Sequence, residues 1–415
     1  MATQDYPITE RRLKIITTVP SIGALFLIQL AGVYVMDWWF HFQLDDTSVR
    51  FWPHLIRAAF VLQLIGYSAF HLKRTWKLRI ARFQFLWLGI LALRFLFHGN
   101  FESEVVLYMS YYAYWVLVMW VAYSLVVDGH LTPKQVAIAG MLANLLQVLR
   151  DALWGLGGIW LGNPLGPGLN PADVVANSAY PIFWFTLMQL LDTDVPLTGP
   201  IALLGLTTIV LTMKRGTLIA LILGALAYGI TYARIHRYSG GIRRVAKISA
   251  IVVVAIGVTA WLRAGAIAER WGDISNPDQA GSGRAVFWAI IAQHWLNADL
   301  ITKFVGFGPH SVYDITAELW FAGVPAHDDW LMLIHEFGII GLIAFAMVCW
   351  AMAKSVPRII RGCPQLAPVF CAALAGALCV TIFDLFAYNT ETSFFGVLIA
   401  IPLGMATRAS PTEVE

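Results

Sequence analysis

Residues 325–352 read PAHDDWLMLIHEFGIIGLIAFAMVCWAM, a histidine and two carboxylates followed at once by an apolar run. The run is long enough to cross a bilayer, since a spanning helix needs about 20 apolar residues. A polar insert of the otherwise apolar chain, residues 263–328, comes before it. The junction between this insert and a spanning helix predicts a reaction site at a membrane surface.

The composition indicates a membrane protein. The 415 residues are 59% hydrophobic and 13% charged, with a mean hydropathy of +0.68. A soluble domain is about 25% charged. The net charge is only +3, and the positive residues lie in short clusters that are typical of topology signals. We therefore expect membrane lipids as neighbours and no nucleic-acid partner.

The four cysteines lie in or beside the last apolar segments and form no close pair. This spacing indicates neither a zinc knuckle nor a disulfide-stapled ectodomain. We expect no metal and no cofactor.

Apolar runs divide the chain into about twelve spans, give or take one or two. The fold class we expect is therefore an all-α polytopic membrane protein, a single domain over residues 1–415, with a large helical loop on the outer side of the membrane between spans 9 and 10. We interpret the first run as a retained anchor rather than a signal peptide. The expected spans are 15–36, 53–72, 83–98, 104–127, 136–150, 174–191, 200–213, 216–235, 245–262, 329–352, 366–385 and 392–407.

Positive charge predicts the orientation, because lysine and arginine are enriched in cytoplasmic loops. With twelve spans, the four basic clusters all fall on one side, which we assign to the cytoplasm together with both termini. The insert 263–328 then lies on the opposite, outer side. The clusters are Arg11 to Lys14, Lys73 to Arg82, Arg234 to Lys247 and Lys354 to Arg361.

Two arginines on the predicted outer side are candidates for binding an anion. Arg215 lies between two apolar runs, against the usual charge bias, and Arg284 follows a Gly-Ser-Gly turn before a stretch with helical spacing. Arginine binds phosphate oxygens through a fork of N–H donors. The alternative is an interfacial arginine for Arg215 and a solvated one for Arg284. Arg263 and Arg270 are weaker candidates for the same anion.

His327 is the candidate general base. It directly precedes a helix that Asp328 or Asp329 could cap, and the positive helix end favours a neutral imidazole that can take a proton. The alternative is a histidine at headgroup level beside capping aspartates. Glu336 lies further into the same span, where a carboxylate is either paired or functional. It could anchor the outer arginines.

Three other chemistries are excluded by their missing motifs. Position 339 is isoleucine, so His335-Glu336 does not begin the His-Glu-x-x-His motif of a zinc protease. Neither a Walker Gly-Lys-Ser/Thr nor a Gly-x-Ser-x-Gly elbow is present.

The order of motifs resembles the O-antigen ligase and polymerase superfamily. The motif-level likeness covers about residues 200 to 341, and Asp328 stands where asparagine is commoner after the histidine. The motifs are Lys214-Arg215-Gly216, Gly283-Arg284 with Trp288, Gly306-Phe307-Gly308, Pro325-Ala326-His327-Asp328-Asp329-Trp330-Leu331 and Glu336-Phe337-Gly338-Ile339-Ile340-Gly341.

This resemblance implies a bacterial inner-membrane glycosyltransferase of the GT-C type, in which the large helical loop 263–328 is a periplasmic loop. It would move a glycan from undecaprenyl diphosphate to an acceptor hydroxyl on the periplasmic face, with inversion and without a metal. Arg215 and Arg284 would hold the diphosphate, His327 would activate the acceptor, and Arg263, Arg270, Asp328 and Glu336 would line the substrate site.

Within this family we favour an O-antigen or exopolysaccharide polymerase, whose acceptor is another lipid-linked glycan. An O-antigen ligase, which uses lipid A-core, is the alternative, and a chain-length regulator is left open as a partner. A transporter or flippase of a lipid-linked anion is a further alternative, since it would share the spans and the arginines.

Overall fold

The computed structural model describes residues 22–41, 47–140, 142, 206, 215–236, 284–317, 323, 325–383, 386–387 and 393–409, with single positions between 243 and 265. These residues form helices and connecting turns and include no strand, so the predicted all-α class is confirmed for them. The helices are α1 (Ile22–His41), α2 (Thr47–Phe70), α3 (Leu72–Thr75), α4 (Arg79–His98), α5 (Ser103–Asp128), α10 (Arg215–Ile235), α13 (Arg284–Asn297), α14 (Leu300–Val305), α15 (Ser311–Ala317), α16 (Asp329–Lys354), α17 (Val356–Gly362), α18 (Ala367–Phe383) and α19 (Ser393–Ala409).

Four described segments are long and apolar enough to cross a membrane. They are Arg79–His98, Tyr108–Asp128, Gly216–Ile235 and Asp329–Gly362. Shorter apolar helices lie in α1, α2, α18 and α19, at four more of the predicted spans. The predicted spans 136–150, 174–191, 200–213 and 245–262 fall wholly or largely outside the described residues. The count of twelve and the side of the membrane that each end faces therefore stay predictions.

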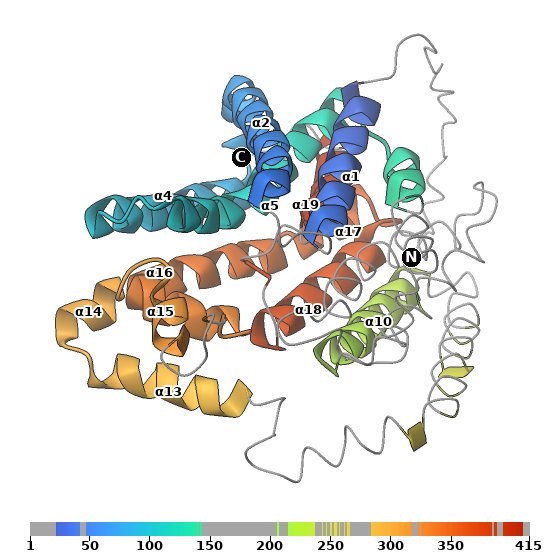
Figure 1. Cartoon of the computed structure of the whole chain (residues 1–415). Coiled ribbons are helices and arrows are strands. Elements are labelled where there is room, and N and C mark those ends of the chain that lie inside the picture. The colour runs from blue at the N-terminus through green and yellow to red at the C-terminus, as the bar shows by residue number, and fades with distance from the viewer. Residues whose placement is uncertain are drawn as a thin grey trace.

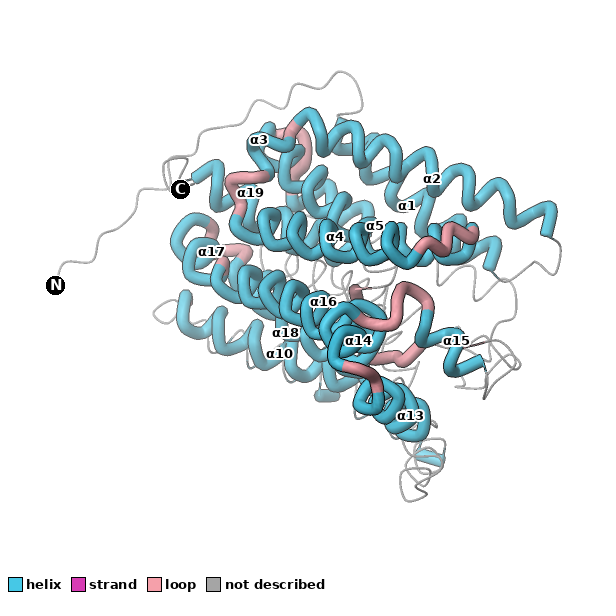
Figure 2. The backbone as a smooth tube through the Cα atoms, turned by 90° about the vertical axis from the view of Figure 1, so that its left-hand side faces the viewer, coloured by secondary structure: helices cyan, strands magenta, loops and turns pink. Residues whose placement is uncertain are grey.

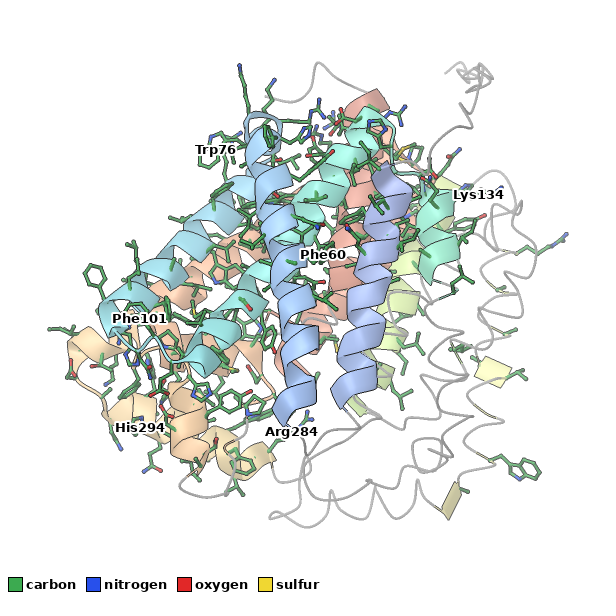
Figure 3. The ribbon with its side chains drawn as sticks, turned by 45° about the horizontal axis from the view of Figure 1, so that its top comes forward. Phe60, Trp76, Phe101, Lys134, Arg284 and His294 are labelled. Atoms are coloured by element: carbon green, nitrogen blue, oxygen red, sulfur yellow. The ribbon has the colours of Figure 1, made fainter. Side chains whose placement is uncertain are left out.

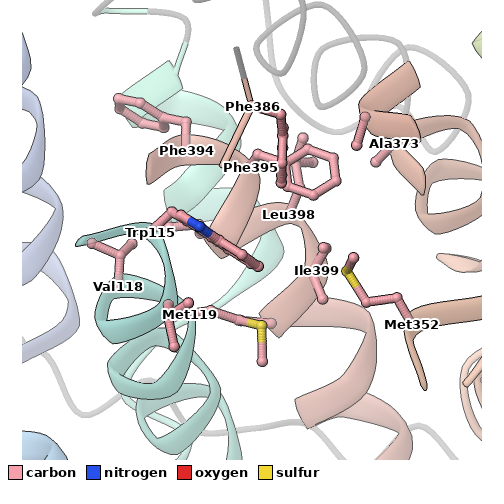
Figure 4. Close-up of a cluster of buried hydrophobic side chains, with 14 of the residues drawn as sticks. Trp115, Val118, Met119, Met352, Ala373, Phe386, Phe394, Phe395, Leu398 and Ile399 are labelled. Atoms are coloured by element: carbon pink, nitrogen blue, oxygen red, sulfur yellow. The ribbon is translucent and has the colours of Figure 1, made fainter. Parts of the chain in front are cut away.

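Helix α5 forms the centre of the described bundle. Its Trp115 and Tyr123 side chains are buried, and α19 packs along it. A β-carbon at Gly396 would lie 2.6 Å from the Trp115 carbonyl oxygen, so this glycine lets the two helices approach closely. Figure 4 shows Trp115 of α5 beside Phe394 and Phe395 of α19, and Met119 on the side of Ile399.

The helix ends form two groups. In one group, Arg74 pairs with Asp128, and Arg358 donates a hydrogen bond of 3.0 Å to Thr407. In the other, α13, α14 and α15 lie together beside α16 (Figures 1 and 2). The first group carries basic residues of two predicted cytoplasmic clusters, and the second carries the described part of the insert 263–328.

Helix α16 is broken at Gly338, so the expectation of one continuous span over 329–352 is wrong at that residue. Gly338 has φ 66° and ψ −169°, which is not helical. The rings of Trp330 and Phe345 lie 5.5 Å apart. In a straight helix, these two positions would be separated by about 22 Å at 1.5 Å per residue. The segment before Gly338 therefore folds back alongside the segment after it.

The loop after α14 satisfies the backbone groups that the break exposes. The Phe307 N–H donates to the His335 carbonyl (2.9 Å), and the Gly308 N–H donates to the Glu336 carbonyl (3.0 Å). A β-carbon at Gly338 would collide with the Phe304 carbonyl. Buried backbone groups need such partners. The motifs Gly306-Phe307-Gly308 and Glu336-Phe337-Gly338 therefore contact each other directly.

We expect Gly338→Ala to lower the apparent melting temperature of the purified protein. Its backbone conformation is accessible essentially only to glycine, and holding another residue there costs about 1–3 kcal/mol before the collision is counted. Gly89→Ala is the matched control, because a β-carbon at this position in α4 would have no neighbour within 4 Å. Melting of both variants in the same detergent is the measurement, and equal melting temperatures would contradict the role of the break.

Candidate functional site

The Arg284 side chain contacts the end of α18. Its Nη1 donates a hydrogen bond of 2.6 Å to the carbonyl oxygen of Phe383, and the residue is half-buried. Arg284 is the first residue of α13, which confirms the helix predicted from the spacing after it. A guanidinium has five N–H donors, so this one bond to Phe383 leaves capacity for the oxygens of an anion.

The start of α10 also lies beside Phe383. Arg215 is the first residue of α10, although the position of its side chain lies outside the described part. A β-carbon on Gly216 would lie 3.0 Å from the Phe383 Cβ. The glycine of the Lys214-Arg215-Gly216 motif therefore lets α10 approach the residue that Arg284 contacts.

The His327 segment is tied to α13 by a tryptophan. Trp288, one turn after Arg284, donates from Nε1 to the carbonyl oxygen of Ala326 at 2.6 Å. His327 follows with φ 52°, an uncommon conformation for a residue other than glycine. Such strain costs about 1–3 kcal/mol and is concentrated at functional sites.

The two aspartates after His327 have different structural roles. Asp328 is the N-cap of α16 and accepts the Leu331 N–H at 2.9 Å, which confirms the predicted capping for this residue. Asp329 is buried, and its Oδ2 accepts the N–H groups of Phe386 (2.7 Å) and Ala387 (2.9 Å). The start of α16 is thereby fixed to the turn after α18.

Glu336 does not belong to this group of contacts. It is buried, and its Oε2 accepts a hydrogen bond of 2.6 Å from Tyr108 Oη in α5. Among the described residues it forms no ion pair with an arginine, and the expected anchoring of the outer arginines stays a prediction, because the side chains of Arg215, Arg263 and Arg270 lie outside the described part. Its Oε1 has no hydrogen-bond partner in the described structure. The Glu336 backbone carbonyl accepts the Gly308 N–H, so this residue is part of the break in α16.

Sequence reasoning missed Arg94 in α4. Its Nη2 donates to the Gly306 carbonyl at 2.8 Å, so it holds the loop that satisfies the break. Like Arg284, this residue is half-buried. A lone arginine within an apolar run was the signal that could have found it.

A histidine pair was also missed. His335 Nε2 lies 3.1 Å from His294 Nδ1, and His335 Nδ1 lies 3.1 Å from Ser311 Oγ (Figure 3 labels His294). This pair joins α13, α15 and α16 into one unit. His294 and His335 are 41 residues apart in the chain, so helical periodicity gave no signal for their contact.

Two predicted substrate residues, Arg263 and Arg270, lie outside the described residues. Among the residues that the structure does describe, no group of three His, Cys, Asp or Glu side chains could hold a metal ion. The structure thus brings together Arg284, the backbone beside Arg215, and the His327 segment, whereas Glu336 lies at a separate contact. Comparison with protein-family models and with curated proteins finds no match to this chain.

We expect Asp328→Asn to raise stability at pH 7. Burial raises the pKa of the Asp328 carboxyl, although hydrogen bonds from the Leu331 and Trp330 N–H groups oppose this. A folded pKa above the unfolded value of about 3.9 means that ionisation of the carboxyl opposes folding above that pH. Asparagine keeps the cap without the charge.

The measurement is the apparent melting temperature of wild type and Asp328→Asn at pH 7 and near pH 4. The advantage of Asp328→Asn should shrink as the pH falls, because wild-type Asp328 becomes neutral. Asp328→Ala is the control that loses the cap, at a cost of about 1 kcal/mol. An advantage of asparagine that is independent of pH would contradict the assignment.

Tyr108 and Glu336 should be strongly coupled. Tyr108→Phe leaves a buried carboxyl without its hydrogen bond, which costs about 1–3 kcal/mol. A double-mutant cycle with Glu336→Leu, which removes the acceptor, should therefore give a coupling energy well above the few tenths of a kcal/mol expected for distant residues. Additive losses of stability in the cycle would show that the two side chains do not act together.

Proposed function

We propose that this protein is an inverting glycosyltransferase that moves a glycan from undecaprenyl diphosphate to an acceptor hydroxyl at the periplasmic face of the bacterial inner membrane. Among acceptors we favour another lipid-linked glycan, which would make it an O-antigen or exopolysaccharide polymerase. The motif order supports the family, and the apolar helices are compatible with the membrane setting.

One observation carries the proposal: three motifs far apart in sequence meet at the end of α18. Arg284 hydrogen-bonds the Phe383 carbonyl, and Gly216 packs against the same residue. Trp288 connects the Arg284 helix to Ala326, next to His327. A diphosphate site and a base have to be neighbours for this chemistry, and these contacts support that requirement.

The chemistry needs only charge stabilisation and one base. The acceptor oxygen attacks the anomeric carbon, the bond from that carbon to the diphosphate oxygen breaks, and the acceptor proton passes to His327. The diphosphate leaves with the electron pair, so it needs cationic donors rather than a protonating acid. Arg215 and Arg284 are the residues proposed to supply them, and attack opposite the leaving group inverts the anomeric centre.

We expect His327→Ala to reduce transfer by about 10²–10⁴-fold, the usual contribution of a general base. His130→Ala is the matched control. This exposed histidine follows the C-terminal end of α5, whereas Tyr108, near the N-terminal end of α5, contacts Glu336 of α16. The assay uses purified protein, a chelator and a short undecaprenyl-diphosphate oligosaccharide, alone and with lipid A-core.

The products distinguish the alternatives. A ladder formed from the donor alone, and lost only in His327→Ala, supports the polymerase. Transfer that requires lipid A-core identifies a ligase. Binding of the donor by both histidine variants and by wild type, without transfer under any condition, favours a transporter and contradicts the enzyme. Full activity of His327→Ala would remove the histidine from the mechanism.

A further inference from the structure

Helix α14 exposes an apolar surface although it belongs to an insert expected to face water. Leu300 and Ile301 are 71% and 75% exposed, and Phe304 is 45% exposed. Leu296, at the end of α13, continues this surface at 60%. We call these four side chains the α14 edge. A water-facing loop has no reason to gather large apolar side chains in so short a helix.

The α14 edge lies close to the last turn of a candidate spanning helix, α4. Arg94, near the end of α4, donates to the Gly306 carbonyl directly after α14. The ring of His98 lies where a β-carbon on Gly308 would be. Figures 1 and 3 show α14 at the edge of the molecule where α4 ends and Phe101 follows. The edge is therefore level with the end of a segment that itself can cross a membrane.

The surfaces next to the edge are apolar as well. On α4, Leu96 and Phe97 are 59% and 82% exposed. On α16, just past the break that contacts α14, Ile340 and Ile343 are 43% and 54% exposed. Both helices are among the four candidate spans, so these side chains would face lipid. Helix α14 packs against α16, and the loop after it contacts α4, so the α14 edge borders that surface.

A charged group lies at the start of the short helix. The Asp299 carboxylate caps α14 by accepting the Thr302 N–H at 3.0 Å and the Thr302 hydroxyl at 2.6 Å. These hydrogen bonds hold the pKa of Asp299 below its usual range, so the cap is a charged group that needs water. A helix at a membrane interface buries apolar side chains among the acyl chains and keeps its charged groups in water, and α14 has groups of both kinds.

We propose that the α14 edge is inserted among the acyl chains of the bilayer, so that part of the insert 263–328 is a membrane-embedded element rather than a water-facing loop. The occupant of this surface is lipid, because the edge borders the lipid-facing sides of α4 and α16. This placement is independent of the glycosyltransferase activity. It implies that the loop which satisfies the break in α16 is held at the membrane boundary.

The test places a nitroxide spin label at Ile301→Cys in protein reconstituted into lipid nanodiscs. The four native cysteines are replaced by alanine, and the labelled parent supplies the background. Asp314→Cys is the control, since the Asp314 side chain in α15 is 75% exposed and polar. Leu300→Cys is a second reporter if the first variant does not fold.

Collision rates with oxygen, which concentrates in lipid, and with a water-soluble nickel chelate are compared. We expect the label at position 301 to favour oxygen several-fold over the chelate relative to the label at position 314. Equal access of the chelate at both positions would overturn the proposal in favour of a water-facing loop. Low access of both reagents at position 301 would also overturn it, because protein would then cover the edge.

Discussion

The break in α16 is the constraint on which the described site depends. The Phe307 and Gly308 N–H groups donate to the carbonyls of His335 and Glu336, and the positive φ of Gly338 reverses the chain. An unsatisfied backbone group in an apolar surrounding costs several kcal/mol. The break therefore persists only because a second segment supplies its hydrogen bonds, and the two segments hold each other in place.

The position of the candidate base follows from this reversal. The segment before Gly338 returns toward α18, where Asp329 accepts the Phe386 and Ala387 N–H groups. His327 therefore comes directly before a helix start that is fixed by buried hydrogen bonds. Discontinuous helices in membrane proteins characteristically bring helix ends to functional sites. Asp328 contributes as a cap, and its carboxylate accepts the Leu331 N–H.

The sequence predicted much of the candidate site as motifs but not as contacts. Arg284 was identified from its glycine turn, and the structure adds its bond to Phe383. Glu336 was identified from its depth in an apolar run, but its partner is Tyr108, 228 residues away in the chain. Arg94 was missed because its role depends on Gly306, 212 residues away. Local spacing carries no information about such partners.

The sequence by itself determined the helical class, the apolar segments and the positions of the helix starts at Arg215 and Arg284, because periodicity and capping are local properties. Only the tertiary structure decided that the run 329–352 breaks, since an apolar stretch containing Gly338 is equally compatible with a straight helix. It also decided which motifs meet at Phe383. The physical reason is that hydrogen bonds between distant segments, rather than local preference, select the conformation of a glycine and the partners of a buried charge.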